Sequence, residues 1–236
     1  MNQLYPTKEV YNCVIPQNIF QTWHTKKLPP LMFASIEKLK KNNPCFKHYL
    51  YDDNECREFI KNNYDSHVLN AFDNLIPGAY KADLWRYCIL YRYGGIYLDI
   101  KYVHTRDFKL INLIEKEHWV LDADNFGIYN ALLVCKQGNP ILLRAINQIV
   151  QNVKNKFYGT NCLQPTGPQL LSMFFTEEEK QNFDMKHNFV NTLNNRYITL
   201  NKIIVMASYK GYLQESKNYQ IVNHYGVLWN NRQIYK

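Results

Sequence analysis

Three charged residues within one short stretch carry the clearest chemical signal in the sequence. Asp83 and Arg86 are three residues apart in an apolar, helix-forming run from Ala79 to Arg92, so they share one face of a predicted, largely buried helix. A short apolar strand predicted at 96–98 then places Asp99 at its tip. Buried charges are costly unless they are paired or used. Asp83 and Arg86 therefore either form an internal ion pair or belong to a binding site. The nearby Asp99 favours the binding site.

Two segments of this stretch form a pattern far more specific than a lone D-x-D triplet: A-D-L-W-R-Y at 82–87 and Y-G-G-I-Y-L-D-I-K at 93–101. They resemble the shared core of glycosyltransferase family 32, the DXD-motif sugar transferases, which are related to the catalytic domains of clostridial glucosylating toxins. The resemblance extends over roughly residues 14–229. One departure bears on the chemistry, because Lys101 stands where the motif has its second acid.

The resemblance implies a retaining glycosyltransferase that moves a hexose from a nucleotide-sugar, a UDP- or GDP-sugar, to a hydroxyl of a glycan, protein or small-molecule acceptor. In such enzymes the counterparts of Asp83 and Arg86 hydrogen-bond the hydroxyls of the donor sugar, which suits a carboxylate acceptor and a fork of guanidinium donors. Asp99 matches the acid that contacts the ribose or the sugar and, through water, a metal ion. Stabilisation of the departing diphosphate would supply most of the catalysis, without a side-chain nucleophile.

Three further residues are candidates for donor binding. Trp23 ends the first predicted strand and matches the family's tryptophan that stacks on the nucleobase; its alternative role is to fill the core. The family counterpart of Tyr97 lies against the nucleotide, although a strand tyrosine is more often part of the core. Asn130, in the I-Y-N-A run at 128–131, is a candidate for the sugar or acceptor pocket.

Asp99 and His224 are the predicted ligands of a divalent ion, Mn²⁺ or Mg²⁺. His224 begins a segment that resembles the family's H-x-x-x-S-W element, with Leu228 in place of the serine, and a histidine there would ligate the ion or contact the diphosphate. The triplet Asp122-Ala123-Asp124 is a weaker candidate metal site, because it follows a predicted strand and its two acids share one face if the backbone is extended.

Lys101 leaves two outcomes open for this site. In an extended segment Lys101 and Asp99 point to the same side, so the ammonium either neutralises the departing diphosphate itself, without a metal, or turns outward to solvent. In the second case Asp99, His224 and Asp124 keep a weaker metal ion. We favour the retained, weakened metal site because of the position of His224. The alternative function is a non-catalytic relative that binds a nucleotide or a glycan, since Lys101 breaks the motif.

The order of elements predicts an α/β fold. Strand, helix, strand and helix alternate over 14–61, which is typical of a parallel sheet. The family resemblance implies the GT-A type, with a mixed, mostly parallel sheet flanked by helices in a single domain, 1–236. Further strands are predicted at 118–122, 128–135 and 196–206, the last with a turn inside it, and further helices at 65–73, 141–153, 166–175 and 177–182.

The composition of the chain limits the kinds of partner and the location that we expect. The net charge of +8 is scattered and accompanies no recognised nucleic-acid-binding motif, so nucleic acid is not an expected partner, and a basic balance suits an anionic diphosphate. No apolar run approaches the ~20 residues that a membrane span requires. The N-terminal residues lack the layout of a signal peptide. We therefore expect a cytoplasmic protein whose six cysteines are reduced.

Overall fold

The structure is a computed structural model that describes residues 5–190, 195–219 and 222–236. Its strands are β1 (Asn18–Thr22), β2 (Lys47–Tyr51), β3 (Gly95–Leu98), β4 (Tyr102–His104), β5 (Val120–Leu121), β6 (Leu132–Cys135), β7 (Met185–Val190), β8 (Asn195–Leu200) and β9 (Ile203–Ser208). Its α-helices are α1 (Pro30–Asn42), α2 (Asp53–Asn63), α3 (Ser66–Asn74), α4 (Gly78–Tyr93), α5 (Pro140–Lys154), α6 (Pro168–Ser172), α7 (Glu177–Gln181), α8 (Tyr212–Asn218) and α9 (Tyr225–Asn230). A 3-10 turn lies at Leu110–Leu113.

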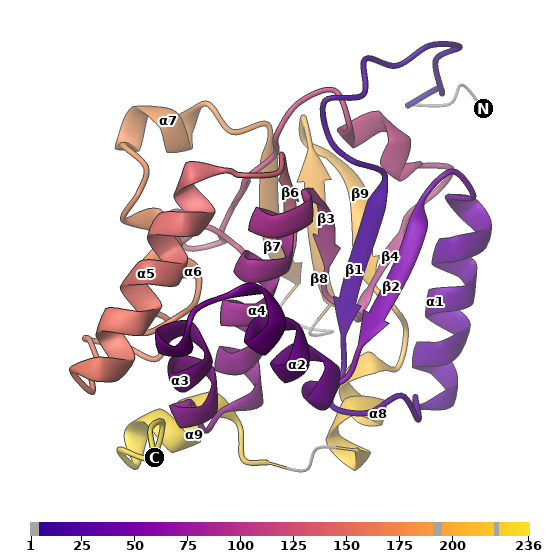
Figure 1. Ribbon diagram of the computed structural model, residues 1–236. Coiled ribbons are helices and arrows are strands. Elements are labelled where there is room, and N and C mark those ends of the chain that lie inside the picture. Colours follow the sequence, from indigo (N-terminus) through magenta and orange to yellow (C-terminus); the bar gives the residue numbers. More distant parts are fainter. Residues whose placement is uncertain (1–4, 191–194, 220–221) are drawn as a thin grey trace.

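The first sheet brings the carboxyl ends of three parallel strands to one edge. Its order is β2-β1-β3-β6, with β1 parallel to both β2 and β3, and with β6 antiparallel to β3 (Figure 1). Phe20 of β1 is level with Tyr97 of β3. Trp23 and Asp99, which follow these two strands, therefore emerge at the same edge, where ligands of open α/β sheets bind.

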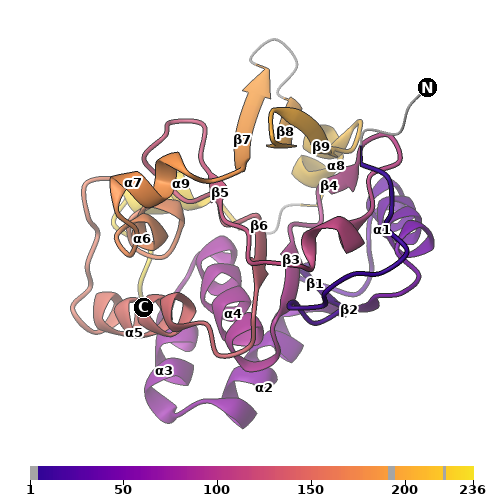
Figure 2. The same cartoon turned by 90° about the horizontal axis from the view of Figure 1, so that it is seen from above.

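Alternation along the strands divides the interior into two cores. Phe20 and Tyr97 face the core that helices α2 to α5 cover, whereas Ile19 and Ile96 face a second core. Successive side chains of a strand point to opposite faces of the sheet, so a sheet with a core on each side has apolar residues at both positions. Figure 2 shows α2, α3, α4 and α5 on one side of the first sheet and strands β4, β7, β8 and β9 on the other.

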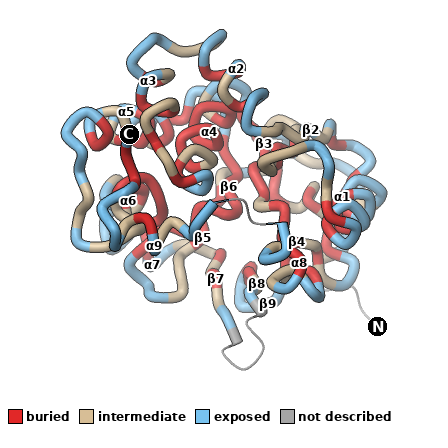
Figure 3. Tube along the Cα trace, turned by 90° about the horizontal axis from the view of Figure 1, so that it is seen from below, coloured by how far each residue is buried: buried red, intermediate tan, exposed pale blue. Residues whose placement is uncertain are grey.

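Helix α4 and strand β3 form the buried centre that delivers Asp99, and Figure 3 shows both in the most buried class for most of their length. Gly94 ends α4 with φ 62°, and Gly95 opens β3 with φ 119°. These backbone angles favour glycine. A Cβ atom on Gly95 would also lie 2.7 Å from the carbonyl oxygen of Asn18. The predicted helix, glycine turn and strand are confirmed.

The second sheet was predicted only in part. Its order is β4-β9-β8-β7-β5, and only the β7–β5 pair is parallel among its described pairings. The strand predicted at 196–206 is confirmed as β8 and β9 with their turn, but β7 and β4 were not predicted. The prediction of mixed strands flanked by helices is confirmed. The expectation that they are mostly parallel holds only within the first sheet, because three of the seven described pairings are parallel and four are antiparallel.

The described residues also bear on the expectations about membrane spans and cysteines. None of the helices within the described ranges is long and apolar enough to cross a membrane. All six cysteines are free, as expected, and the thiol of Cys88 is fully buried in α4.

Candidate active site

Arg86 lies between two carboxylates at the centre of the site. Its Nη2 is 3.4 Å from Asp83 Oδ1, and its Nη1 is 3.4 Å from Asp99 Oδ1. The guanidinium carbon also lies 4.3 Å from the ring centroid of Tyr97. Burial lowers the pKa of Arg86, but Tyr97, Asp83 and Asp99 outweigh burial and raise that pKa above its ordinary value. The three charged residues that the sequence singled out therefore meet in one buried network.

Asp83 is held by residues from two distant segments. Asn130 donates its side-chain amide to Asp83 Oδ1 at 2.8 Å, and Thr166 donates its hydroxyl to Asp83 Oδ2 at 2.7 Å. The carbonyl of Asn130 in turn accepts a hydrogen bond from Arg86 Nη1 at 2.7 Å. Burial raises the pKa of Asp83, while Arg86 and these two donors oppose the rise. Both carboxylate oxygens thus have partners inside the protein: Asn130 and Arg86 at Oδ1, and Thr166 at Oδ2.

Asp99 and Lys101 form a second ion pair beside this network. Lys101 Nζ is ion-paired with Asp99 Oδ2, and the Tyr97 hydroxyl donates to Asp99 Oδ1 at 2.7 Å. Burial raises the pKa of the Asp99 carboxyl, but Lys101 and Arg86 outweigh burial and lower it. Burial lowers the pKa of Lys101, and Asp99 outweighs that effect and raises it. Both groups are therefore charged at neutral pH.

The geometry around Lys101 corrects two expectations. Residues 99–102 form a turn, in which the Tyr102 amide donates to the Asp99 carbonyl at 3.0 Å, and are not extended. Lys101 is only 8% exposed, so the alternative in which it turns outward to solvent is wrong. The turn directs the Lys101 ammonium toward the Asp99 carboxylate. The two opposite charges attract each other strongly there, because little water reaches them.

Aromatic residues that were not predicted from the sequence lie near the Lys101–Asp99 ion pair. Lys101 Nζ lies 5.6 Å from the ring centroid of Tyr129. Burial raises the pKa of Tyr212, on α8, and the charge of Asp99 also raises it while that of Lys101 lowers it. Arg196, on β8, is hydrogen-bonded to Tyr129, and burial lowers its pKa while Tyr129 raises it. Tyr129 therefore contacts two cations, Lys101 and Arg196.

Trp23 and Tyr97 differ in how open they are to a ligand. Trp23 is half-buried and packs against the small core cluster that contains Met32 and Tyr209. Its backbone amide donates to the Tyr51 carbonyl at 3.1 Å. The indole Nε1 of Trp23 is buried and has no hydrogen-bond partner among the described residues, although the residue as a whole keeps part of its surface exposed. Tyr97 is 2% exposed and lies beneath the Arg86 guanidinium. Tyr97 is therefore a core residue that orients Asp99, and its ring is not open for nucleotide stacking.

The predicted metal ligands do not form a donor set that fits a divalent ion. Both oxygens of Asp99 are engaged, one by the Tyr97 hydroxyl and one by the Lys101 ammonium. His224 is exposed and caps α9, its Nδ1 accepting from the Gly226 amide at 3.2 Å. Within residues 5–190, 195–219 and 222–236, no group of three or more His, Cys, Asp or Glu residues could hold a metal ion.

The D-x-D triplet at 122–124 is not extended, so its two acids do not form a metal site. Asp122 accepts a hydrogen bond at 2.8 Å from Nδ1 of His187, whose ring stacks on Tyr129 at 3.7 Å. Asp124 instead accepts from the backbone amides of Phe126 and Gly127 and closes a turn. The triplet therefore shapes the loop beside the site.

Comparisons with known proteins agree with this architecture. The family described as a glycosyltransferase sugar-binding region containing a DXD motif matches residues 29–121. Inositol phosphoceramide mannosyltransferase 3 of Schizosaccharomyces pombe is 31% identical over 176 residues, which are 73% of this chain and 49% of that protein. The initiation-specific alpha-1,6-mannosyltransferase of Candida albicans is 34% identical over 91 residues, which are 36% of this chain and 24% of that protein.

The fold is also similar to a solved structure. The PaToxG glycosyltransferase superposes with a TM-score of 0.52 at 16% identity, covering 67% of each chain, which supports the GT-A-like fold alone. The chain spans about half the length of the yeast inositol phosphoceramide mannosyltransferases that it matches. The expected family is thus confirmed, and the chain belongs to the DXD-motif glycosyltransferases of family 32.

Proposed function

We propose that the protein transfers a hexose from a nucleotide-sugar, a UDP- or GDP-sugar, to a hydroxyl acceptor with retention of configuration. Mannose is the sugar that the names of its relatives favour. The observation that carries the proposal is the position of Arg86 between Asp83 and Asp99, at the carboxyl end of β3. Such a network presents fixed donors and acceptors together, which suits the hydroxyls of a sugar.

The residues of the network have separate roles in this reaction. Asp83 and Arg86 hold the donor-sugar hydroxyls, with Asn130 and Thr166 fixing the Asp83 carboxylate. Trp23 stacks on the nucleobase at the same edge of the sheet. Because these groups are already oriented in the folded protein, they need no reorganisation when charge develops during transfer.

We further propose that positive side chains, and no metal ion, balance the departing diphosphate. Lys101 is fixed by Asp99 beside the site, and Arg196 is hydrogen-bonded to Tyr129, whose ring centroid lies 5.6 Å from the Lys101 ammonium. Ammonium and guanidinium groups both bind phosphate oxygens. A single charge stabilises the diphosphate less than a divalent ion at equal distance, so the enzyme would be slow.

The bond changes need no nucleophile from the protein. The bond between the anomeric carbon and the diphosphate oxygen breaks, and the acceptor oxygen bonds to the same carbon on the same face. The proton of the acceptor hydroxyl passes to the departing diphosphate oxygen. The chain's own residues orient the two sugars and bind the diphosphate in a site whose charges are largely shielded from water.

The second candidate function is a relative that binds a nucleotide or a glycan without transfer, and the Lys101–Asp99 ion pair favours it because this pair replaces the usual acids. Titration of UDP- and GDP-sugars, with a panel of hydroxyl acceptors, separates the two. Slow hydrolysis or transfer from one donor supports the enzyme. Binding with no turnover across the panel supports the non-catalytic relative. No nucleotide binding at all overturns the enzyme and a nucleotide-binding relative, and leaves only a relative that binds a glycan alone.

A further inference from the structure

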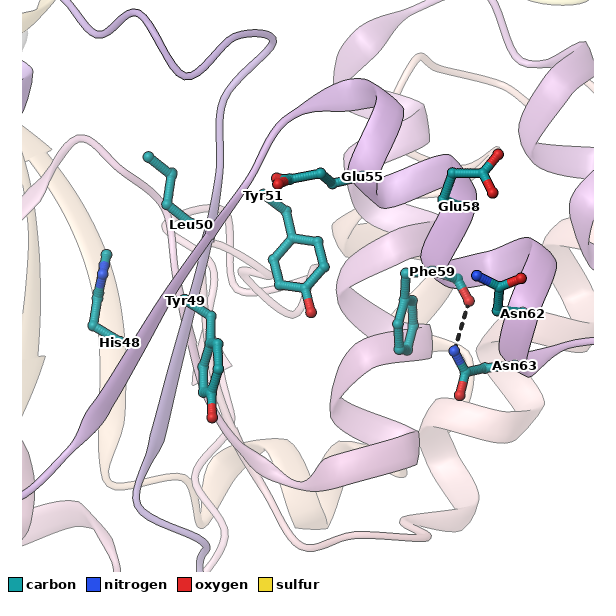
Figure 4. A pocket seen from close by; sticks show the side chains of 9 residues that line it. All are labelled: His48, Tyr49, Leu50, Tyr51, Glu55, Glu58, Phe59, Asn62 and Asn63. Atoms are coloured by element: carbon teal, nitrogen blue, oxygen red, sulfur yellow. Dashed lines mark hydrogen bonds between the residues drawn. The ribbon is translucent and has the colours of Figure 1, made fainter.

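A hollow of about 570 Å³ lies between strand β2 and helix α2, and none of its lining residues belongs to the Asp99 network (Figure 4). A volume of this size lies within the range of small-ligand sites, about 300–1,000 Å³. The strand contributes four consecutive residues and the helix five: His48, Tyr49, Leu50, Tyr51, Glu55, Glu58, Phe59, Asn62 and Asn63.

Aromatic rings fixed by their neighbours form the strand side of the hollow. The ring of Tyr49 stacks on Phe20 with 5.3 Å between centroids and 17° between planes, and it is 38% exposed. The ring of Tyr51 packs against Trp85 at 5.0 Å and against Phe59 at 6.2 Å. Figure 4 shows Tyr51 reaching from the strand toward the helix, with Phe59 on the helix opposite it. Ordered rings of this kind offer flat apolar faces at little entropic cost.

Neutral and acidic groups form the helix side. The Asn63 amide donates to the Phe59 carbonyl at 2.8 Å, which leaves its own side-chain oxygen free to accept from a ligand. Glu58 and Asn62 stand beside it along the same helix (Figure 4). Among the described residues, no lysine or arginine lines the hollow itself. The cations nearest to its two glutamates are already ion-paired with them, Lys26 with Glu55 and Lys61 with Glu58. An anionic ligand such as a nucleotide would therefore find no excess positive charge, so this surface disfavours it.

A peptide strand is the other ligand that an outer strand attracts. β2 is the outermost strand of the first sheet, so within the part of the chain that the structure describes no strand pairs with its outer edge. However, the backbone carbonyl of Leu50 on this strand already accepts from the Lys26 ammonium, which is also ion-paired with Glu55. A lysine placed on an edge strand in this way blocks the addition of another strand.

We propose that this hollow is a binding site for a neutral saccharide. The apolar face of a sugar ring would stack on Tyr49 and Tyr51, and its hydroxyls would bond to Glu58, Asn62 and Asn63. Tyr51, which lines the hollow, accepts a hydrogen bond at its carbonyl from the Trp23 amide at 3.1 Å. A glycan held here would therefore extend toward the edge of the sheet that carries the site. The inference goes beyond the proposed function, because it concerns binding in the absence of a nucleotide-sugar.

The test is an NMR titration of the ¹⁵N-labelled full chain with methyl α-mannoside, methyl β-glucoside and methyl β-galactoside, without nucleotide. We expect saturable shifts of the amides of Tyr49, Tyr51 and Asn63 with at least one glycoside. Tyr49→Ala should weaken that binding about two- to tenfold, the equivalent of one lost aromatic contact. The control is Phe126→Ala, which removes a ring that is 69% exposed and lies outside the hollow, and it should leave binding unchanged.

Absence of shifts with all three glycosides up to their solubility would overturn the proposal. So would binding that Tyr49→Ala leaves intact. Shifts of the His48 and Leu50 amides with an extended neutral peptide, and none with the glycosides, would identify a strand-addition edge instead. The variant Asp99→Asn separates this proposal from the proposed function, because it should keep the glycoside shifts at Tyr49 even if no transfer activity is ever found.

Discussion

The ammonium of Lys101 is ion-paired with the Asp99 carboxylate, in the place where the DXD motif has its second acid. Both side chains are largely buried, 10% and 22% exposed respectively. A cation in that place cannot ligate a metal ion and repels one. This single pair therefore decides whether the site works through a divalent ion or through the positive charges of its own side chains.

Replacing Lys101 by aspartate should create the metal site that the motif normally provides. The variant removes the competing ammonium and supplies a second carboxylate beside Asp99, and paired carboxylates are typical ligands of Mn²⁺ and Mg²⁺. We expect electron paramagnetic resonance to detect bound Mn²⁺ in Lys101→Asp and none in the parent protein. Lys101→Met is the control, since it removes the charge without adding a ligand. Equal Mn²⁺ binding by the parent would contradict the account.

Asp83→Asn should lower turnover while leaving the protein folded. Losing a hydrogen bond to a charged group costs about 1.5–3 kcal/mol, or about one to two decades in rate. The measurement is donor hydrolysis per folded molecule, with folding followed by circular dichroism. The matched control is Asp73→Asn, because Asp73 also pairs with an arginine, Arg57, at 2.6 Å but on the surface. If Asp83→Asn only lowers the melting temperature, the pair with Arg86 is structural.

Trp23→Ala should weaken nucleotide binding by about 1–3 kcal/mol, the value of one stacked base. The free nucleoside diphosphate and the intact donor should lose affinity alike, since stacking is present before and during transfer. Isothermal titration calorimetry with UDP and GDP measures the change. Phe33→Ala, which removes a 55% exposed ring on α1, serves as the control. Unchanged affinity in Trp23→Ala would assign the indole to the core.

Acid should destabilise the fold through His48. Burial lowers the pKa of this histidine from 6.5 to about 4, and its Nε2 is 2.8 Å from the Gln21 side-chain oxygen. The unfolded chain therefore takes up a proton as the pH falls through 6.5, while the folded chain does not until about pH 4. The stabilisation is complete above pH 6.5 and is lost progressively down to about pH 4.

Urea unfolding at a series of pH values between these limits measures that loss. The variant His48→Gln keeps a side-chain amide that can bond to Gln21 but has no group that titrates in this range. Its unfolding free energy should therefore depend less steeply on pH than that of the parent. Identical pH profiles for the two proteins would show that His48 contributes nothing to the acid sensitivity.

The sequence predicted the part of the site that is local in the chain. Asp83 and Arg86 are neighbours on one helix, and Asp99 follows after a glycine turn and a short strand, so spacing alone brings these three together. The partners of Asp83 are different, because Thr166 is 83 residues away and is joined to it only by the packing of α4 against the loop before α6. A T-G-P turn indicates the start of a helix and carries no sign of this bond.

The rest of the site depends on the second sheet, which the sequence indicated only weakly. β7 reads M-K-H-N-F-V, and its alternation is interrupted by polar residues that pair with other loops. Arg196 lies on β8 and Tyr212 on α8. Their positions near the site depend on how β8 and α8 pack, which the spacing of residues in the sequence does not predict. The direction of the Lys101 side chain was likewise not predicted. It depends on a turn that the hydrogen bond from the Tyr102 amide to the Asp99 carbonyl fixes.

The most direct test of the central claim is the rate of donor hydrolysis with EDTA present, compared with the rate in Mn²⁺. The donor should first be identified from a panel of UDP- and GDP-sugars, with GDP-mannose included because of the relatives' names. We predict slow hydrolysis that is equal in EDTA and in Mn²⁺, and that falls at least tenfold in Lys101→Met. Hydrolysis that disappears in EDTA and returns with Mn²⁺ would contradict the account, and would restore a metal ion to the Asp99 site.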